Sequence, residues 1–235
     1  MGIKKYYLKF TNRLRYAEYK AQLDHINSYR SWIAGNRPFP PPHIVKQLLV
    51  RENAGSCGGN IFIETGTFKG DMVDAMASHF TRVYSIELSE TLHRETKLRF
   101  QSNRNVNLLC GDSAVLLPRI LKEIDVPCLF WLDGHYSGGE TAKGGKETPI
   151  LAELQAIAAH PVRLHTILID DARLFIGAND YPSIAQLRGF LSGIDPTFEM
   201  EIHDDVIFIR RGKTSWIHSQ NTDFADILKK SLRTI

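Results

Sequence analysis

The sequence predicts an α/β fold built on one mostly parallel sheet that ends in an antiparallel hairpin. After Gly58 and Gly59, short apolar runs alternate with longer segments of helical spacing, which is the pattern of repeated βαβ units. Near the end of the chain, alternating runs at 198–203 and 206–210 are separated only by Asp204 and Asp205. A two-residue connection requires antiparallel pairing, so a terminal hairpin is expected.

Five apolar runs are predicted to be the parallel strands, and with the hairpin they make a seven-stranded sheet. Each run is short enough for a strand and is followed by a segment with helical periodicity. Helices are therefore expected between the strands. The predicted parallel strands are 60–64, 82–87, 106–110, 128–132 and 166–170.

Three parts of the chain are predicted. Residues 1–55 form a helical appendage, with an amphipathic helix near 11–33, a proline cluster and a second helix near 43–51. Covering one edge of the core is its expected role, with a lid or a homodimer contact as the alternative. Residues 56–211 form the α/β domain, and 212–235 form a tail.

Length and composition exclude several classes of protein. A chain of 235 residues, 43% hydrophobic and 23% charged, is long enough for one well-buried domain of ordinary globular composition. A net charge of +3 gives no indication of a nucleic-acid partner. No apolar run is long enough to cross a membrane, and no apolar leader follows the start, so a cytoplasmic protein without a membrane partner is expected.

The turn after the first strand carries the most specific motif. Glu64, Gly66 and Gly70 form the pattern Glu-x-Gly-x-x-x-Gly between a buried strand and a helix that begins near Asp71. An unrelated glycine turn is the alternative. The pattern resembles the first motif of the class I S-adenosylmethionine-dependent methyltransferases, which implies a Rossmann-like fold and binding of S-adenosylmethionine by Glu64, Gly66, Thr67 and Gly70.

Acids at the next two strand ends extend this resemblance. Glu87 stands about twenty residues past Gly66, where such folds place the carboxylate that binds both ribose hydroxyls. Asp112 and Ser113 resemble the turn that contacts adenine in this family. Each could instead cap a helix. A nicotinamide dehydrogenase is less favoured, because it would show glycines spaced two and then three apart.

Three carboxylates are expected at the ends of the fourth and fifth strands, namely Asp133, Asp170 and Asp171. Carboxylates at one rim must be protonated, paired with cations or bridged by a metal. The arrangement resembles metal-dependent O-methyltransferases, which implies Mg²⁺ bound by all three. Helix capping by Asp171, and hydrogen bonding of substrate or cofactor by Asp133, remain the alternatives.

The segment after the fourth strand is expected to contribute to catalysis. His135 follows Asp133 in a glycine-rich loop and is a candidate general base, although it could equally orient the substrate or Asp133. The polar loop 137–148 is predicted to gate the substrate. Residues 173–183, after the fifth strand, are expected to line the acceptor pocket.

These features together predict O-methylation of a small hydroxylated metabolite or a sugar, assisted by magnesium. Metal-independent N-methylation of a small metabolite is the nearer alternative. A cofactor-binding scaffold without activity is an alternative from another class.

Overall fold

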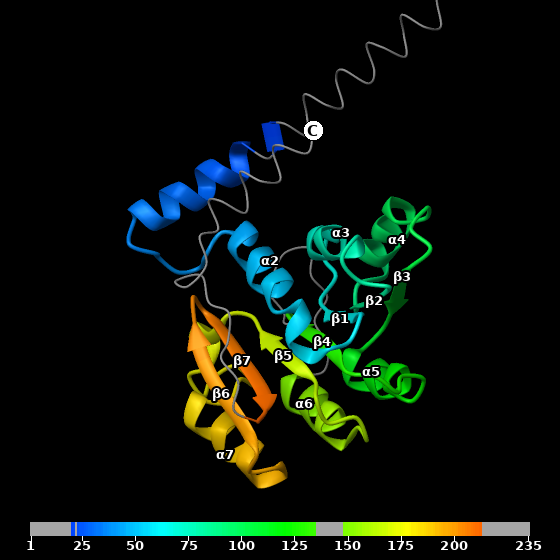
Figure 1. Ribbon diagram of the computed structural model, residues 1–235, viewed down its shortest axis with the longest axis vertical. Coiled ribbons are helices and arrows are strands. Elements are labelled where there is room, and N and C mark those ends of the chain that lie inside the picture. The colour runs from blue at the N-terminus through cyan, green and yellow to red at the C-terminus, as the bar shows by residue number, and fades with distance from the viewer. Residues whose placement is uncertain (1–19, 22, 135–147, 213–235) are drawn as a thin grey trace, which may run out of the picture.

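Seven strands form one sheet in the order β3-β2-β1-β4-β5-β7-β6 (Figure 1). The computed structural model describes residues 20, 21, 23–134 and 148–212, with the backbone alone for 56 and 57. Neighbouring strands are parallel except where β7 pairs with β5 and with β6. The strands are β1 (Ile61–Thr65), β2 (Arg82–Glu87), β3 (Val106–Cys110), β4 (Cys128–Leu132), β5 (Thr166–Ile169), β6 (Phe198–His203) and β7 (Val206–Arg211).

This topology confirms the predicted fold class. The second, third and fourth predicted strands coincide with β2, β3 and β4. The first is shifted by one residue at both ends relative to β1, and the fifth is one residue longer than β5. The turn of the hairpin is Asp204 and Asp205, both with positive φ (49° and 66°), as a two-residue hairpin turn requires.

Helices cover both faces of the sheet (Figure 1). One layer contains α2 (His43–Glu52), α3 (Asp71–Ala77) and α4 (Glu90–Arg99), and the other contains α5 (Ser113–Leu121), α6 (Ile150–Ala159) and α7 (Ile184–Ile194). Short 3-10 helices follow α2 and β5, namely η1 (Ala54–Cys57) and η2 (Ala172–Leu174). None of the helices in the described ranges has the length and apolar character that a membrane span requires.

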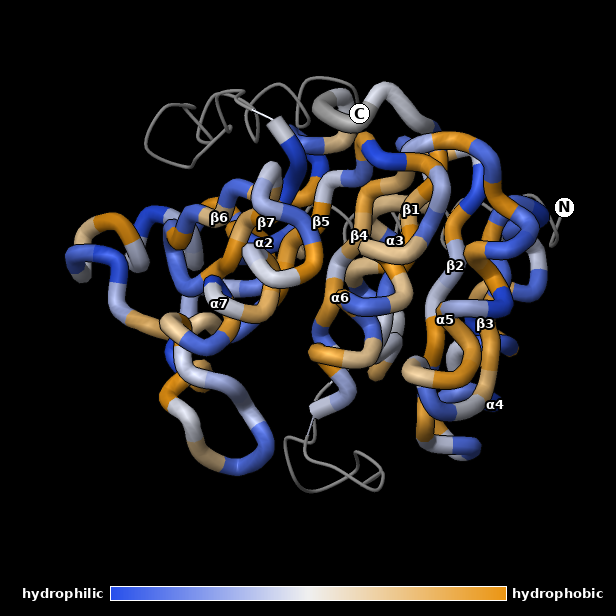
Figure 2. The backbone as a smooth tube through the Cα atoms, turned by 90° about the horizontal axis from the view of Figure 1, so that it is seen from below, coloured by the Kyte–Doolittle hydropathy of each residue, from blue (hydrophilic) through white to orange (hydrophobic). Residues whose placement is uncertain are grey.

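The alternation of side chains along the central strands creates two cores. In β4, Leu129 and Trp131 pack in the core with α2 and α3, whereas Phe130 and Leu132 pack in the core with α5, α6 and α7. All five β4 residues are buried, because helices cover both sides of this strand. Figure 2 shows apolar residues along the central strands, as two buried faces demand.

The helix α2 belongs to the core and covers a face of the sheet. Its Val45, Leu48 and Leu49 are 0–2% exposed and share a core with strand residues such as Phe62. The preceding helix, described over 23–34, adds Ile26, Tyr29 and Trp32 to the same core, at spacings of three residues. The sequence predicted that residues 1–55 cover one edge of the core, whereas α2 covers a face of the sheet. The division at residue 55 remains a prediction.

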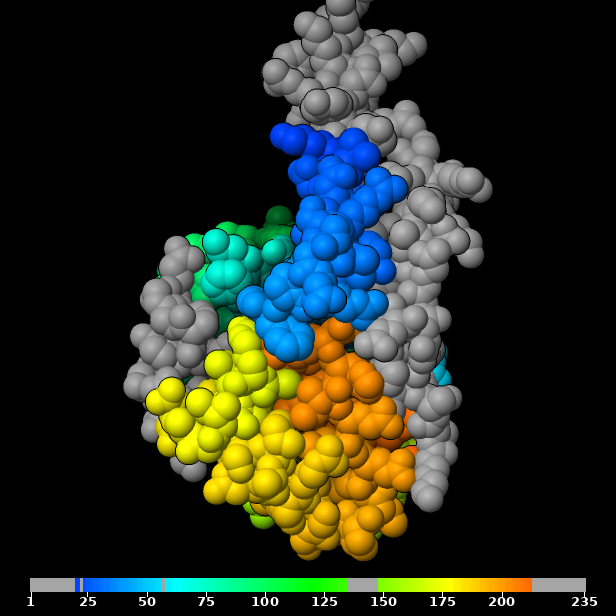
Figure 3. All heavy atoms as spheres, turned by 90° about the vertical axis from the view of Figure 1, so that its left-hand side faces the viewer, coloured from blue at the N-terminus to red at the C-terminus, as the bar shows by residue number. Residues whose placement is uncertain are grey.

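The chain between these two helices also contacts the terminal hairpin. Arg37 forms an ion pair with Asp204 in the β6–β7 turn, at 3.3 Å. In the space-filling view, the blue N-terminal segment lies directly above the orange hairpin (Figure 3). Segments far apart in sequence therefore meet at this end of the sheet.

Candidate cofactor and acceptor site

Four residues extend the parallel ladder beyond the carboxyl ends of the strands. The N–H of Gly66 bonds to Ile86 O (2.9 Å), and the N–H of Gly111 bonds to Glu87 O (2.9 Å). Asp133 and Asp170 continue the row through Thr65 O and Leu132 O, at 3.0 and 3.1 Å. The ends of β1 to β5 are thus aligned at one edge, where open α/β sheets bind their ligands.

Gly66 is required by the approach of two strand ends. Its φ is +85°, and a Cβ at this position would lie 2.3 Å from the backbone oxygen of Asp133. The sequence had attributed this glycine to the approach of a cofactor, whereas the structure shows contact with the neighbouring strand end. Gly70 also has a positive φ of 79°, and a Cβ there would meet the Phe100 ring at the end of α4, at 2.6 Å.

Glu64 lies beneath the turn after β1. Its side chain is buried and accepts a hydrogen bond from the Ser85 hydroxyl at 2.5 Å, and the Thr67 hydroxyl lies 2.6 Å from Ser85 Oγ. Burial raises the pKa of Glu64 well above its usual value, and the Ser85 bond offsets this only in part. Glu64 therefore braces the turn, and its contact with a cofactor stays a prediction.

Glu87 binds the glycine turn from the end of β2. Its carboxylate accepts the backbone N–H of Phe68 and that of Ser89, each at 2.8 Å. Phe68 has a positive φ of 48°, a strained conformation that this bond helps to hold. The sequence placed Glu87 at the ribose; the structure places it beside the Gly66 turn, and its contact with a ribose stays a prediction.

Asp112 and Ser113 begin α5 at the end of β3. Asp112 caps this helix, because its carboxylate accepts the N–H of Ala114 at 2.8 Å. The helix-cap alternative is thus confirmed for Asp112. An adenine contact by the same carboxylate stays a prediction, since a carboxylate accepts several hydrogen bonds at once.

The structure brings together the three acids that the sequence predicted at one rim. One carboxylate oxygen from each of Asp133, Asp170 and Asp171 lies within 4.8 Å of the other two. Asp170 and Asp171 are buried, and Asp133 is half-buried. Asp171 has a positive φ of 55° and precedes η2 without a side-chain cap, so the expected alternative of helix capping is wrong for Asp171.

Two basic residues that sequence reasoning missed pair with these acids. The Lys46 ammonium lies 2.5 Å from Asp170 Oδ2 and 3.2 Å from Asp171 Oδ1. Arg173 bonds to Asp171 Oδ1 at 2.8 Å and also to Asp205 in the hairpin turn. Burial lowers the pKa of Lys46, but Asp170 and Asp171 outweigh it and raise that pKa overall. Lys46 is therefore firmly cationic.

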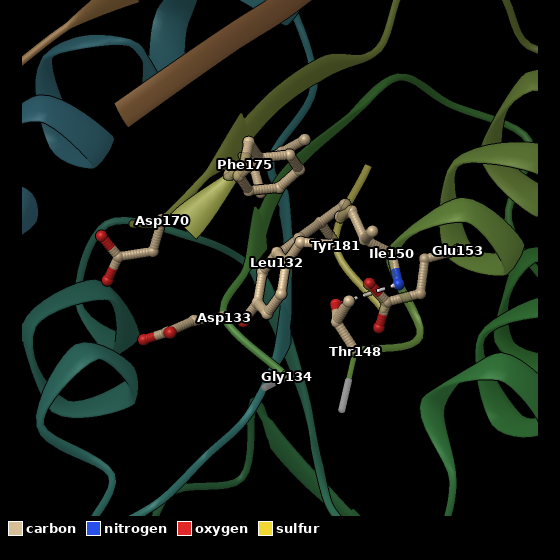
Figure 4. A pocket seen from close by; sticks show the side chains of 10 residues that line it. Leu132, Asp133, Gly134, Thr148, Ile150, Glu153, Asp170, Phe175 and Tyr181 are labelled. Carbon is tan, nitrogen blue, oxygen red and sulfur yellow. Dashed lines mark hydrogen bonds between the residues drawn. The ribbon is translucent and has the colours of Figure 1, made fainter. Parts of the chain in front are cut away.

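A small pocket opens beside the acids, at the ends of β4 and β5. The rings of Phe175 and Tyr181 pack edge to face with centroids 5.2 Å apart and line it. That 173–183 lines the pocket of the acceptor stays a prediction. Figure 4 shows Asp133 and Asp170 directed to one side, with Glu153 across the pocket beside Thr148. The remaining lining residues are Leu132, Gly134, Ile150 and Ile169.

Glu153 is a third residue that sequence reasoning missed. It is 1% exposed, and its Oε1 has no hydrogen-bond partner within the described residues. Burial raises its pKa to about 7, although the nearby Ser113 and Thr65 hydroxyls act in the opposite direction. A signal existed in the sequence, because Glu153 shares the apolar stripe of α6 with Ile150, Leu154 and Ile157.

Part of the predicted site falls outside the described residues. His135, the candidate base, and most of the loop 137–148 belong to this part of the chain. Only Thr148 at the loop's end is described, where its hydroxyl accepts the N–H of Ile150 at 3.3 Å. The roles proposed for His135 and for the loop stay predictions.

The fold recurs in solved structures of methyltransferases. TomG, an O-methyltransferase of Streptomyces achromogenes in complex with S-adenosylmethionine, is 13% identical, with a TM-score of 0.53 over 80% of this chain and 88% of its own. A Podospora anserina methyltransferase bound to S-adenosylhomocysteine is 15% identical, with a TM-score of 0.52 over 87% and 96%. A putative rRNA methylase of Clostridium thermocellum is 15% identical, with a TM-score of 0.50 over 71% and 95%.

Sequence comparison adds no closer relative, since no protein-family model and no curated protein matches the chain. At 13–15% identity the structural likeness establishes the fold and leaves the acceptor open, because the similar structures differ in what they methylate. The chain has the fold of the class I S-adenosylmethionine-dependent methyltransferases.

Proposed function

We propose that this protein is an S-adenosylmethionine-dependent methyltransferase that methylates an oxygen of a small hydroxylated metabolite, such as a sugar. The observation that carries the proposal is the order of groups along one sheet edge. Glu87 and Asp112 follow β2 and β3, the Gly66 turn follows β1, and the acidic pocket follows β4 and β5. A cofactor lying along this edge would have its adenosine over the first three strands and its methyl group facing the pocket.

The reaction would be an in-line displacement. The acceptor oxygen attacks the methyl carbon as the carbon–sulfur bond breaks, and the acceptor proton leaves to a base. We assign that base to His135 or Asp133, which follow β4 directly. The protein's main contribution would be alignment of the two reactants, because the sulfonium is already a good leaving group.

The pocket supports a small acceptor. Phe175 and Tyr181 line it with flat apolar surfaces, which suit one face of a small metabolite or of a sugar ring. A nucleic-acid substrate would need a basic surface, and the net charge is only +3. We therefore favour a small molecule over an RNA acceptor.

N-methylation of a small amine is a second candidate. Asp133, Asp170 and Glu153 are three of the residues that line the same small pocket. A buried acidic pocket favours a cationic or hydrogen-donating acceptor. This alternative needs no metal.

The residues as arranged do not fit a bound magnesium ion. Asp133, Asp170 and Asp171 have the required oxygens within 4.8 Å of one another, but the Lys46 ammonium already bonds two of these carboxylates. Magnesium binds carboxylate oxygens directly, so it would compete with the ammonium for them. The proposed reaction therefore includes no step that needs a metal.

Calorimetry with S-adenosylhomocysteine tests the proposed function. We expect saturable binding to the wild-type chain and a loss of at least about tenfold in affinity for Glu87→Gln, because an amide binds ribose hydroxyls less well than a carboxylate. Absence of binding by folded wild-type protein would contradict the methyltransferase. Stronger thermal stabilisation by NAD than by S-adenosylhomocysteine would favour an oxidoreductase instead.

A further inference from the structure

Lys46 of α2 places an ammonium group inside the acidic centre formed by Asp133, Asp170 and Asp171. Its Nζ lies 2.5 Å from Asp170 Oδ2 and 3.2 Å from Asp171 Oδ1. The side chain of Lys46 is 12% exposed, and those of Asp170 and Asp171 are 2% and 9% exposed. This is a largely desolvated ion pair, so removing the lysine leaves buried carboxylates without their counter-charge.

The helix that carries Lys46 fixes its position. Val45 beside it, and Leu48 and Leu49 in the next turn, are 0–2% exposed in the core beneath the sheet. Any shift or rotation of α2 would withdraw these side chains from a close-packed core. The ammonium is therefore held at the acids by the packing of α2 as well as by charge.

The same contacts use the oxygens that a divalent ion would need. Asp170 Oδ2 bonds to Lys46, while Asp170 Oδ1 accepts the N–H of Asp171 at 2.7 Å. Asp171 Oδ1 is shared between Lys46 and Arg173, at 3.2 and 2.8 Å. Magnesium lies about 2.1 Å from its ligand oxygens, and a neighbouring ammonium would repel it.

We propose that Lys46 is the resident cation of this acidic centre and excludes a divalent metal from it. The role given to this centre in acceptor binding rests on the proposed methyltransferase function. Lys46 acts as a positioning residue that holds the Asp170 carboxylate at the end of β5, beside the acceptor pocket. Arg173 supports Asp171 from the other side while it also pairs with Asp205, so Asp170 and Asp171 both have a cationic partner without a metal.

Magnesium titration of the full chain tests the proposal without measuring turnover. Thermal unfolding and calorimetry would follow added MgCl₂ at constant ionic strength in the wild type, in Lys46→Met and in Lys97→Met, a charge-matched control on the exposed face of α4. We expect saturable binding and a melting temperature raised by several degrees in Lys46→Met only. The wild type and Lys97→Met should change by less than about 1 °C. Adding Asp133→Asn to Lys46→Met should abolish the gain.

Two results would overturn the inference. One is saturable magnesium binding by the wild type that Asp133→Asn removes, and the other is a folded Lys46→Met protein that binds no magnesium. If Lys46→Met does not fold, Lys46→Gln replaces it, because its amide can still donate to Asp170. Titration of the same wild-type sample with S-adenosylhomocysteine separates the two proposals. If the wild type binds neither magnesium nor S-adenosylhomocysteine, the methyltransferase proposal is contradicted, whereas the exclusion of metal by Lys46 still stands.

Discussion

At the residue scale, Glu153 shows how a polar group is retained at an energetic cost. A buried carboxyl with an unsatisfied oxygen is destabilising unless it stays protonated, and its pKa is raised to about 7. The usual value of 4.5 applies to the unfolded chain. Because the folded form holds its proton more tightly, this residue lowers the stability as the pH rises from 4.5 to 7. Tolerance of such a cost beside the pocket is typical of a functional group.

Glu153→Gln is therefore expected to stabilise the protein at alkaline pH. The amide keeps the shape of the side chain and cannot ionise, so the gain should reach about 3 kcal/mol at pH 8 and shrink towards zero near pH 4. Urea unfolding at both pH values measures it. A gain that is equal at both pH values would contradict the assigned ionisation.

At the element scale, the turn between β1 and α3 depends on Gly66. Gly66→Ala should destabilise the fold by about 2 kcal/mol or more, because it combines a positive φ with a Cβ that meets the Asp133 backbone. S-adenosylhomocysteine binding should weaken with it. The matched control is Gly189→Ala within α7, where a Cβ meets nothing within 4 Å. That change should stabilise the protein by about 0.5–1 kcal/mol, and equal losses in the two variants would refute the close approach.

Packing of α2 on the sheet gives a second prediction at this scale. Leu48 is 2% exposed, so Leu48→Ala should lower the free energy of unfolding by about 2–5 kcal/mol. Leu98 on α4 is 65% exposed, so Leu98→Ala should change the free energy of unfolding by no more than about 0.5 kcal/mol. Chemical denaturation measures both. Similar small effects would mean that α2 is an appendage that contributes little to the core.

At the scale of the whole molecule, a buried histidine pair makes the stability depend on pH. The N–H of Cys128 donates to His165 Nδ1 (3.0 Å), and His165 Nε2 lies 3.0 Å from His160 Nδ1. The opposite nitrogen of His160 bonds to the carbonyls of Leu121 and Ile124. The pair thus links β4, the end of α5 and the segment before β5. Burial, together with His160, lowers the pKa of His165 to about 4.

The folded protein should lose stability in acid through this residue. The pKa of His165 is 6.5 in the unfolded chain and about 4 in the folded protein. Its contribution to the free energy of unfolding is therefore complete above pH 6.5 and declines as the pH falls towards 4. His165→Leu should be destabilised at pH 7.5, and its deficit relative to the wild type should narrow by about 2 kcal/mol at pH 5. Denaturant titrations at the two pH values provide the comparison. A constant deficit would mean that His165 is not the titrating group.

The elements and the order of groups along the sheet edge follow from patterns in the sequence. Apolar runs, glycine spacing and the acidic hairpin turn are local signals, and they predicted the strands, the Gly66 turn and the convergence of Asp133, Asp170 and Asp171. Parallel strands all end at one edge, so residues that follow them must come together. Local patterns suffice for such conclusions.

The groups that surround these acids depend instead on how distant parts of the chain pack together. Lys46 and Asp170 are 124 residues apart, and no local pattern in α2 marks Lys46 as their partner. Likewise, the contact of Gly66 with Asp133 and the exposure of Glu153 depend on how strands and helices pack. The acids were predictable because topology alone brings strand ends together, whereas their counter-charge depended on the rotation of a helix about its axis, which packing sets.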